Sequence, residues 1–188
     1  NVVVNGLILD AYGRKLSKKL RNYTEPEIIF NKYGADALRY FLLSSTPMGE
    51  DYQFSDKGVA EVFRKVIDKF RNVFNFYELY ADNQFQEVRP PEINRQYLGG
   101  RTSQTLNILD KWVLARLHET AKKMTDKMEA YELTEATRIL IDFIDDLSNW
   151  YLRRSRKRFS GKDLKKASAV LGYVILETSK LMAPFAPF

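Results

Sequence analysis

The chain contains no cysteine and only one histidine among its 188 residues. The lack of cysteine excludes disulfide bonds, thiolate metal sites and thiol nucleophiles. His118 alone cannot form the histidine cluster of a zinc site. No run of about 18 apolar residues occurs, so the sequence predicts no membrane-spanning helix. No metal site and no membrane segment are therefore expected, and we expect a cytoplasmic location.

Apolar and basic residues are what the chain has in quantity. Hydrophobic residues make up 45% of it and aromatic residues 13%, which is too much apolar material for a disordered chain and predicts a folded core. Thirty lysines and arginines stand against 24 acidic residues, a formal net charge of +6. A basic excess favours polyanionic partners. The total is modest, so the distribution of the charges matters more.

Apolar residues recur at helical spacing along most of the chain, and turn-forming residues separate the segments. Ser55, Asp110 and Thr134 are each expected to cap a helix. The sequence predicts helices over residues 26–33, 35–43, 56–80, 111–130, 134–159 and 162–182.

The first part of the chain has a different pattern. Residues 1–9 are rich in β-branched side chains around Asn5-Gly6, which predicts two short strands joined by a turn. Residues 10–23 and 46–54 are expected to be loops.

The predicted fold is therefore mainly α, with two domains. Residues 1–54 form a short α/β piece, whose first strand begins as though inside a larger sheet. Residues 55–188 form an antiparallel helical bundle. Residues 82–107 contain Pro90-Pro91 and Gly99-Gly100 and little apolar periodicity, so we expect an irregular insertion on the surface.

Four cations lie within six residues of the first predicted loop. They are Arg14, Lys15, Lys18 and Lys19. A lysine loop suits phosphate chemistry, because ammonium groups neutralise the charge of a departing pyrophosphate. Ser17 could donate a hydrogen bond or orient the backbone. The alternative is a solvated basic face, which charge alone favours.

The sequence of segment 15–19, Lys-Leu-Ser-Lys-Lys, resembles the Lys-Met-Ser-Lys-Ser signature of class I aminoacyl-tRNA synthetases. Gly13-Arg14 before it, Asn22-Tyr23 after it and segment 33–39 also resemble that family. The resemblance implies that the loop closes over ATP, with Mg2+ present. It further implies that Lys18 stabilises the transition state of adenylate formation, with assistance from Lys15. Lys19 replaces the final Ser of the signature, which resembles one branch of the isoleucine synthetases.

A second group of cations ends the predicted helix 134–159. This group consists of Arg153, Arg154, Arg156, Lys157 and Arg158. Basic residues at a helix C-terminus stabilise the helix through its dipole, but that does not require so many of them. Arginine at this density suits phosphate contacts through its planar, forked guanidinium.

The members of this group differ in their predicted roles. Arg153, Arg156, Lys157 and Arg158 are candidates for tRNA contacts. Arg154 lies four residues after Trp150, on or near the apolar face, where it would pair with an aspartate or stack on an aromatic ring. Trp150 could stack on an unpaired base. A core position is the favoured alternative for Trp150, because it continues the apolar stripe.

Segment 149–159 is very similar to a segment in the anticodon-binding domain of isoleucyl-tRNA synthetases, although Ser160 stands where that family commonly has Trp. Segment 181–188 resembles the family's Leu-Ala-Pro-Phe-x-Pro-Phe. The resemblance implies a monomeric parent enzyme that joins isoleucine to tRNA(Ile) in two steps, through isoleucyl-adenylate. Two other hypotheses remain at this point. One is a free-standing RNA-binding helical module, and the other is an interaction bundle without an RNA role.

The catalytic signature His-x-Gly-His of this family does not occur in these residues, nor do its amino-acid pocket and editing domain. The chain alone is therefore predicted to be inactive in aminoacylation.

Overall fold

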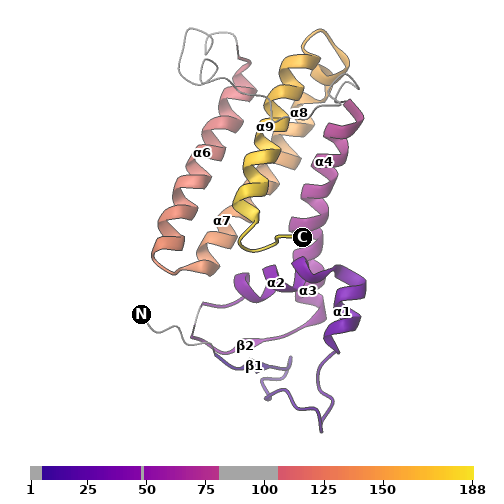
Figure 1. The fold of residues 1–188 in the computed structure, drawn as a ribbon, viewed down its shortest axis with the longest axis vertical. Helices are drawn as coiled ribbons and strands as arrows, with labels where there is room; N and C mark the ends of the chain where they lie inside the picture. The colour runs from indigo at the N-terminus through magenta and orange to yellow at the C-terminus, as the bar shows by residue number, and fades with distance from the viewer. Residues whose placement is uncertain (1–5, 48, 81–105) are drawn as a thin grey trace. The chain divides into compact units, whose positions relative to one another are not determined.

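The structure is a computed structural model that describes residues 6–47, 49–80 and 106–188 (Figure 1). Helices dominate it, so the mainly α prediction is confirmed. Residues 1–5 of the first predicted strand and residues 82–105 of the predicted insertion lie outside the described ranges. The elements in chain order are β1 (Ile8–Leu9), α1 (Pro26–Tyr33), α2 (Ala35–Ser44), β2 (Tyr52–Gln53), α3 (Asp56–Val62), the π-helical segment η1 (Phe63–Asp68), α4 (Lys69–Tyr80), α6 (Ile108–Glu129), α7 (Leu133–Asp145), the π-helical segment η4 (Asp146–Leu152), α8 (Arg153–Ser155), the 3-10 segment η5 (Arg156–Ser160) and α9 (Leu164–Met182).

The chain folds into two compact units. The first contains residues 1–68, 122–141 and 182–188, and the second contains residues 69–121 and 142–181. The predicted division at residues 54 and 55 stays a prediction. Among the described helices, none combines the length and the apolar character needed to cross a membrane.

Helices α1, α2 and α3 pack on one another in the first unit. Their shared core consists of Ile29, Ala37, Phe41 and Val59. Ser55 caps α3 as predicted, since its hydroxyl oxygen accepts a hydrogen bond from the Gly58 N–H at 3.1 Å.

Strand β1 pairs with part of a segment that was predicted to be a loop, whereas the predicted pairing within residues 1–9 involves residues outside the described ranges. β1 pairs in parallel with β2, in the register Ile8 with Tyr52 and Leu9 with Gln53. Segment 46–54 is therefore not entirely a loop. The prediction failed because this pairing joins residues more than 40 positions apart and each strand is only two residues long.

Thr134 does not cap α7, which begins one residue earlier at Leu133. Its hydroxyl donates instead to the carbonyl oxygen of Thr46 at 2.8 Å. A second hydrogen bond of this kind lies in the first unit, where the buried hydroxyl of Tyr40 donates to the carbonyl oxygen of Thr137 at 2.7 Å. These two hydrogen bonds hold the first part of α7 against α2 and against Thr46, which follows α2.

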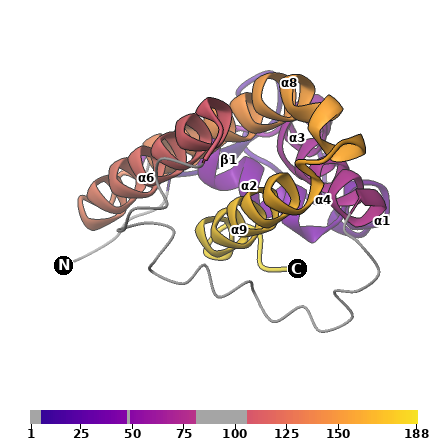
Figure 2. The ribbon, with the colours of Figure 1, turned by 90° about the horizontal axis from the view of Figure 1, so that it is seen from above.

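The second unit is a bundle of α4, the first part of α6, the run of segments from residue 142 to 160, and α9. Successive helices run in opposite directions (Figure 1), and Figure 2 shows the same helices from above. One apolar core lies among them, and its largest buried members are Phe143, Tyr151, Phe159, Leu117, Leu147 and Leu171. The predicted antiparallel arrangement is confirmed for this unit.

Asp110 is not the cap of α6, contrary to the sequence prediction. The helix begins at Ile108, and Asn107 accepts the hydrogen bond from the Leu109 N–H at 2.9 Å. Asp110 lies in the first turn and is buried. A carboxylate near a helix start is favourable in either position, so the sequence could not distinguish them.

Candidate functional site

The lysine loop follows β1 and folds back toward it. Gly13 adopts a φ of +77°, which favours glycine, and the chain then forms an antiparallel bridge between Leu9 and Lys15. Lys15 and Lys18 are exposed, whereas Ser17 is half-buried. The loop therefore has a fixed base and exposed ammonium groups.

Asp10 and Asn22 hold that base. The buried Asp10 carboxylate accepts hydrogen bonds from the Arg14 N–H at 2.9 Å, from Arg14 Nε at 2.8 Å and from Asn22 Nδ2 at 3.0 Å. The Asn22 side chain accepts from the Ser17 N–H at 2.9 Å and donates to the Lys15 carbonyl at 3.2 Å. The backbone of the loop is thus held on both sides of Leu16.

These hydrogen bonds set the charge state of Asp10. Burial alone would raise the pKa of its carboxyl group. Hydrogen bonds from the Arg14 backbone, the Asn22 side chain and the Arg14 side chain outweigh burial and lower the pKa from 3.8 to about 2. Asp10 is therefore ionised at neutral pH, which suits an acceptor of several N–H groups.

Lys15 and Lys18 extend from this base with exposed ammonium groups. In the part of the chain that the structure describes, no carboxylate lies within ion-pair distance of Lys15 or Lys18. A hollow of about 560 Å³ lies beside the loop, and the predicted residues Lys15, Ser17 and Lys18 do not line it. Its lining is Asp10, Ala11, Tyr12, Arg14, Arg21, Asn22, Tyr23, Thr24, Phe54, Ser55, Asp56 and Lys57.

The basic segment, residues 153–158, contains α8 and the start of η5. Arg153, Arg156 and Lys157 are exposed, and no carboxylate of the described residues pairs with them. Arg158 differs, because it is only 12% exposed and is paired with Asp110 and Asp163. The prediction that Arg158 contacts tRNA is therefore revised, since its guanidinium is already engaged within the protein.

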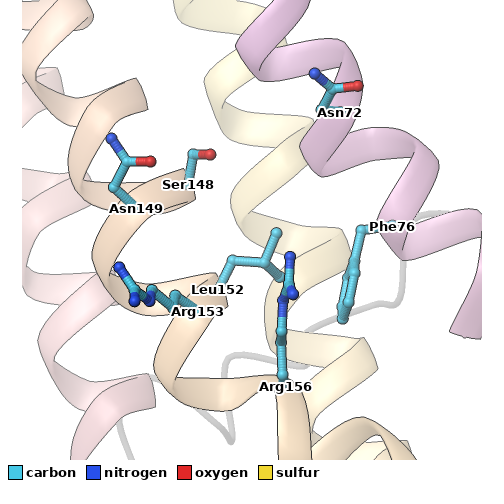
Figure 3. A pocket seen from close by; sticks show the side chains of 7 residues that line it. All are labelled: Asn72, Phe76, Ser148, Asn149, Leu152, Arg153 and Arg156. Carbon is cyan, nitrogen blue, oxygen red and sulfur yellow. The ribbon is translucent and has the colours of Figure 1, made fainter.

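A pocket of about 270 Å³ opens beside the basic segment. It is lined by Asn72, Phe76, Ser148, Asn149, Leu152, Arg153 and Arg156. Figure 3 shows the Arg156 side chain extended beside Phe76, in the space between α8 and α4, with Arg153 nearer to Asn149. Two guanidinium groups, two side-chain amides and an aromatic edge fit a nucleotide, which carries both a phosphate and a flat base.

The segment that leads into this pocket is π-helical. A π-helical turn holds more residues than an α-helical turn, so the side chains that follow it are rotated relative to those before it. η4 thereby changes which side chains after residue 152 face outward. The sequence predicted one regular helix here and contained no signal for this irregularity.

Trp150 already has neighbours on its ring. The Trp112 ring centre lies 4.0 Å from that of Trp150, and the Arg154 guanidinium lies 4.8 Å from it. The predicted stacking of Arg154 on an aromatic ring is therefore confirmed. The partly buried Trp150 thus packs against these neighbours and against the apolar core, and we leave it out of the proposed interface. No group of three or more potential metal ligands gathers within the described ranges.

Comparison with known proteins gives two family matches and close sequence relatives. Residues 1–55 match tRNA synthetases class I (I, L, M and V), and residues 110–188 match the anticodon-binding domain of tRNA ligase. Isoleucine–tRNA ligases of Chlamydia trachomatis serovar D and Chlamydia muridarum are 40% and 42% identical to the chain over its entire length. The chain belongs to the class I aminoacyl-tRNA synthetases. It spans 18% of the length of either relative, so it corresponds to a segment of such a synthetase.

Solved synthetase structures share this fold. The LeuRS of Agrobacterium radiobacter K84, in a ternary complex with tRNA and LeuAMS, matches 97% of the chain and 21% of its own, with a TM-score of 0.68 and 23% identity. A methionyl-tRNA synthetase of Mycobacterium tuberculosis, in complex with methionyl-adenylate, matches 96% of the chain and 35% of its own, with a TM-score of 0.68 and 18% identity. These structures show the fold alone, and the family matches together with the sequence relatives confirm the predicted family resemblance.

Sequence reasoning missed several residues of this synthetase segment. Asp10 carried a weak signal, because a carboxylate four residues before Arg14 in a turn can accept its backbone N–H. Asn72 and Phe76 carried none, since they lie on a helix far in sequence from the basic segment. Only the packing of α4 beside η4 and α8 brings them to the pocket.

Proposed function

We propose that this chain is the part of an isoleucine–tRNA ligase that carries the mobile ATP loop and the tRNA-binding helices. The whole ligase would activate isoleucine with ATP and transfer it to tRNA(Ile). The observation that carries the proposal is the presence of two groups of exposed cations that pair with no carboxylate of the described residues: Lys15 and Lys18 in one, and Arg153, Arg156 and Lys157 in the other. One group lies on a loop held at its base, and the other lies at the end of a helix.

The lysine loop is proposed to act on the triphosphate. Lys18 stabilises the negative charge that develops as pyrophosphate leaves, Lys15 assists, and Ser17 orients the backbone between them. The hydrogen bonds of Asp10 and Asn22 to the loop backbone support this role, because they fix the base while leaving the ammonium groups exposed. Mg2+ would accompany the ATP phosphates, and we assign no residue of this chain to it.

The basic segment is proposed to contact tRNA. Arg153, Arg156 and Lys157 would pair with phosphates, and the pocket beside Phe76 would take a nucleotide of the same strand. We further propose that the ligase is a cytoplasmic monomer. The lack of cysteine supports the location.

Charge reversal at Arg156 tests the tRNA interface. Arg156→Glu removes a phosphate contact and places a carboxylate at the pocket. Affinity for tRNA(Ile) should fall about tenfold, and the slope of log affinity against log salt should become shallower by about one. Electrophoretic binding over a salt series measures both quantities.

Lys122→Glu is the matched control for this experiment. It makes the same charge change at an exposed position of α6, outside the basic segment. Its affinity should change much less than that of Arg156→Glu, with the salt slope retained. A wild-type chain with no salt-dependent affinity would favour an interaction bundle without an RNA role. An unchanged slope in Arg156→Glu would remove that residue from the interface.

A further inference from the structure

An ionic cluster centred on the buried Asp110 holds Arg158, the last residue of the basic segment. Arg158 donates from Nη1 and Nη2 to the two oxygens of Asp110, at 2.7 and 2.6 Å, and from Nε to Asp163 at 2.7 Å. The Tyr151 hydroxyl donates to Asp110 at 2.8 Å. Asp110 is 1% exposed. The cluster joins the start of α6, η4, η5 and the residue before α9.

Burial of Asp110 and Arg158 makes each depend on the other, because a buried charge without its partner is strongly destabilising. Burial alone would lower the pKa of Arg158, but hydrogen bonds to Asp110 and Asp163 outweigh it and raise the pKa. Well-packed apolar side chains often stabilise a core as well as a buried ion pair does, so such pairs can be retained because they fix one arrangement. The bidentate contact between Arg158 and Asp110 can fix one arrangement, since it sets the direction of the guanidinium plane as well as its distance from the carboxylate.

The arrangement fixed here is that of the exposed cations. Arg153, Arg154, Arg156 and Lys157 are the exposed cations within the five residues that precede Arg158, and Arg154 lies over the Trp150 ring. The segment ends in the 3-10 turn η5, a poorly hydrogen-bonded form that would fray without an anchor. Gly161 follows immediately and breaks the helix.

We infer that Asp110 and Arg158 are positioning residues for tRNA binding: they hold η5 so that Arg153 and Arg156 stay at the pocket with the spacing that a phosphate backbone requires. The inference rests on the proposed function of the basic segment. Neither residue is assigned a contact with RNA.

The variant Asp110→Asn distinguishes a positioning role from an effect of net charge on tRNA affinity. The substitution removes a negative charge, so charge alone predicts tighter tRNA binding. Positioning predicts the opposite, with affinity for tRNA(Ile) about tenfold weaker and a shallower salt slope, because fewer phosphates are contacted at once. Binding should be measured where circular dichroism shows wild-type helicity. A loss of stability alone would not change the slope of the folded chain.

Asp163→Asn keeps the test decisive if Asp110→Asn does not fold. Asp163 is 39% exposed and supplies only the Nε contact, so this variant should retain its fold while losing the same formal charge. Positioning predicts affinity at or below that of the wild type. Tighter binding by either folded variant would overturn the inference and leave the proposed function standing. A wild-type chain that shows no salt-dependent tRNA binding would overturn both.

Discussion

At the scale of single residues, the lysine loop depends on the charge of Asp10. Its pKa is lowered from 3.8 to about 2 in the folded chain. The stability that this carboxylate contributes is therefore fully present above pH 4 and is lost as the pH falls toward 2. We expect protection of the Arg14 N–H against hydrogen exchange, corrected for the intrinsic rate, to decline over that range.

Asp10→Asn is the control for this pH dependence. Its amide cannot ionise, so the same protection should be lower at neutral pH and nearly constant between pH 5 and 2. Equal pH profiles for the two proteins would show that another group holds the loop.

At the scale of elements, helix α3 depends on the absence of a side chain at Gly58. A Cβ atom there would lie 2.4 Å from Cε2 of Phe41, which is itself buried and packed edge-on against Phe54. Alanine in a helix interior normally gains about 1 kcal/mol over glycine. The clash reverses this gain, and Gly58→Ala should lower the free energy of unfolding by about 1–3 kcal/mol, measured by urea denaturation.

Lys57→Ala provides the comparison at the neighbouring exposed position of the same helix. The free energy of unfolding should change there by no more than about 0.5 kcal/mol. A Gly58→Ala chain as stable as the wild type would mean that the Phe41 ring has room to move.

Most of these elements could be predicted from the sequence, because helical periodicity and caps are local. The helix at Pro26–Tyr33 and the cap at Ser55 follow from neighbouring residues alone. Asp110 and Thr134 were assigned the wrong role because the partners of Asp110 lie 41 and 48 positions away and that of Thr134 lies 88 positions away. The lysine loop and the basic segment were identified from their composition, whereas the pocket at Phe76 depends on packing between distant helices.

At the scale of the whole molecule, we propose that the chain contributes the neutralisation of phosphate charge but not the binding of the amino acid. It contains one histidine, so it lacks the His-x-Gly-His signature that accompanies the lysine loop in its family. Positioning of ATP and amino acid supplies much of the rate of such a reaction. The isolated chain should therefore show no isoleucine-dependent exchange of pyrophosphate into ATP.

A longer ligase that contains this chain is the positive control for the exchange assay and should incorporate labelled pyrophosphate under the same conditions. Exchange by the isolated chain above background would contradict the proposal that the lysine loop needs the rest of the ligase for this reaction.

The paired indoles of Trp112 and Trp150 give the molecule a built-in optical reporter. They are the chain's only two tryptophans, and their ring centres lie 4.0 Å apart in the second unit. Ultraviolet emission excited at the red edge of the absorption band therefore reports on that unit alone, and the coupled rings should add an exciton couplet to the circular dichroism spectrum. Because the Arg154 guanidinium lies over the Trp150 ring, a ligand that draws this arginine away would change the tryptophan emission without any attached dye.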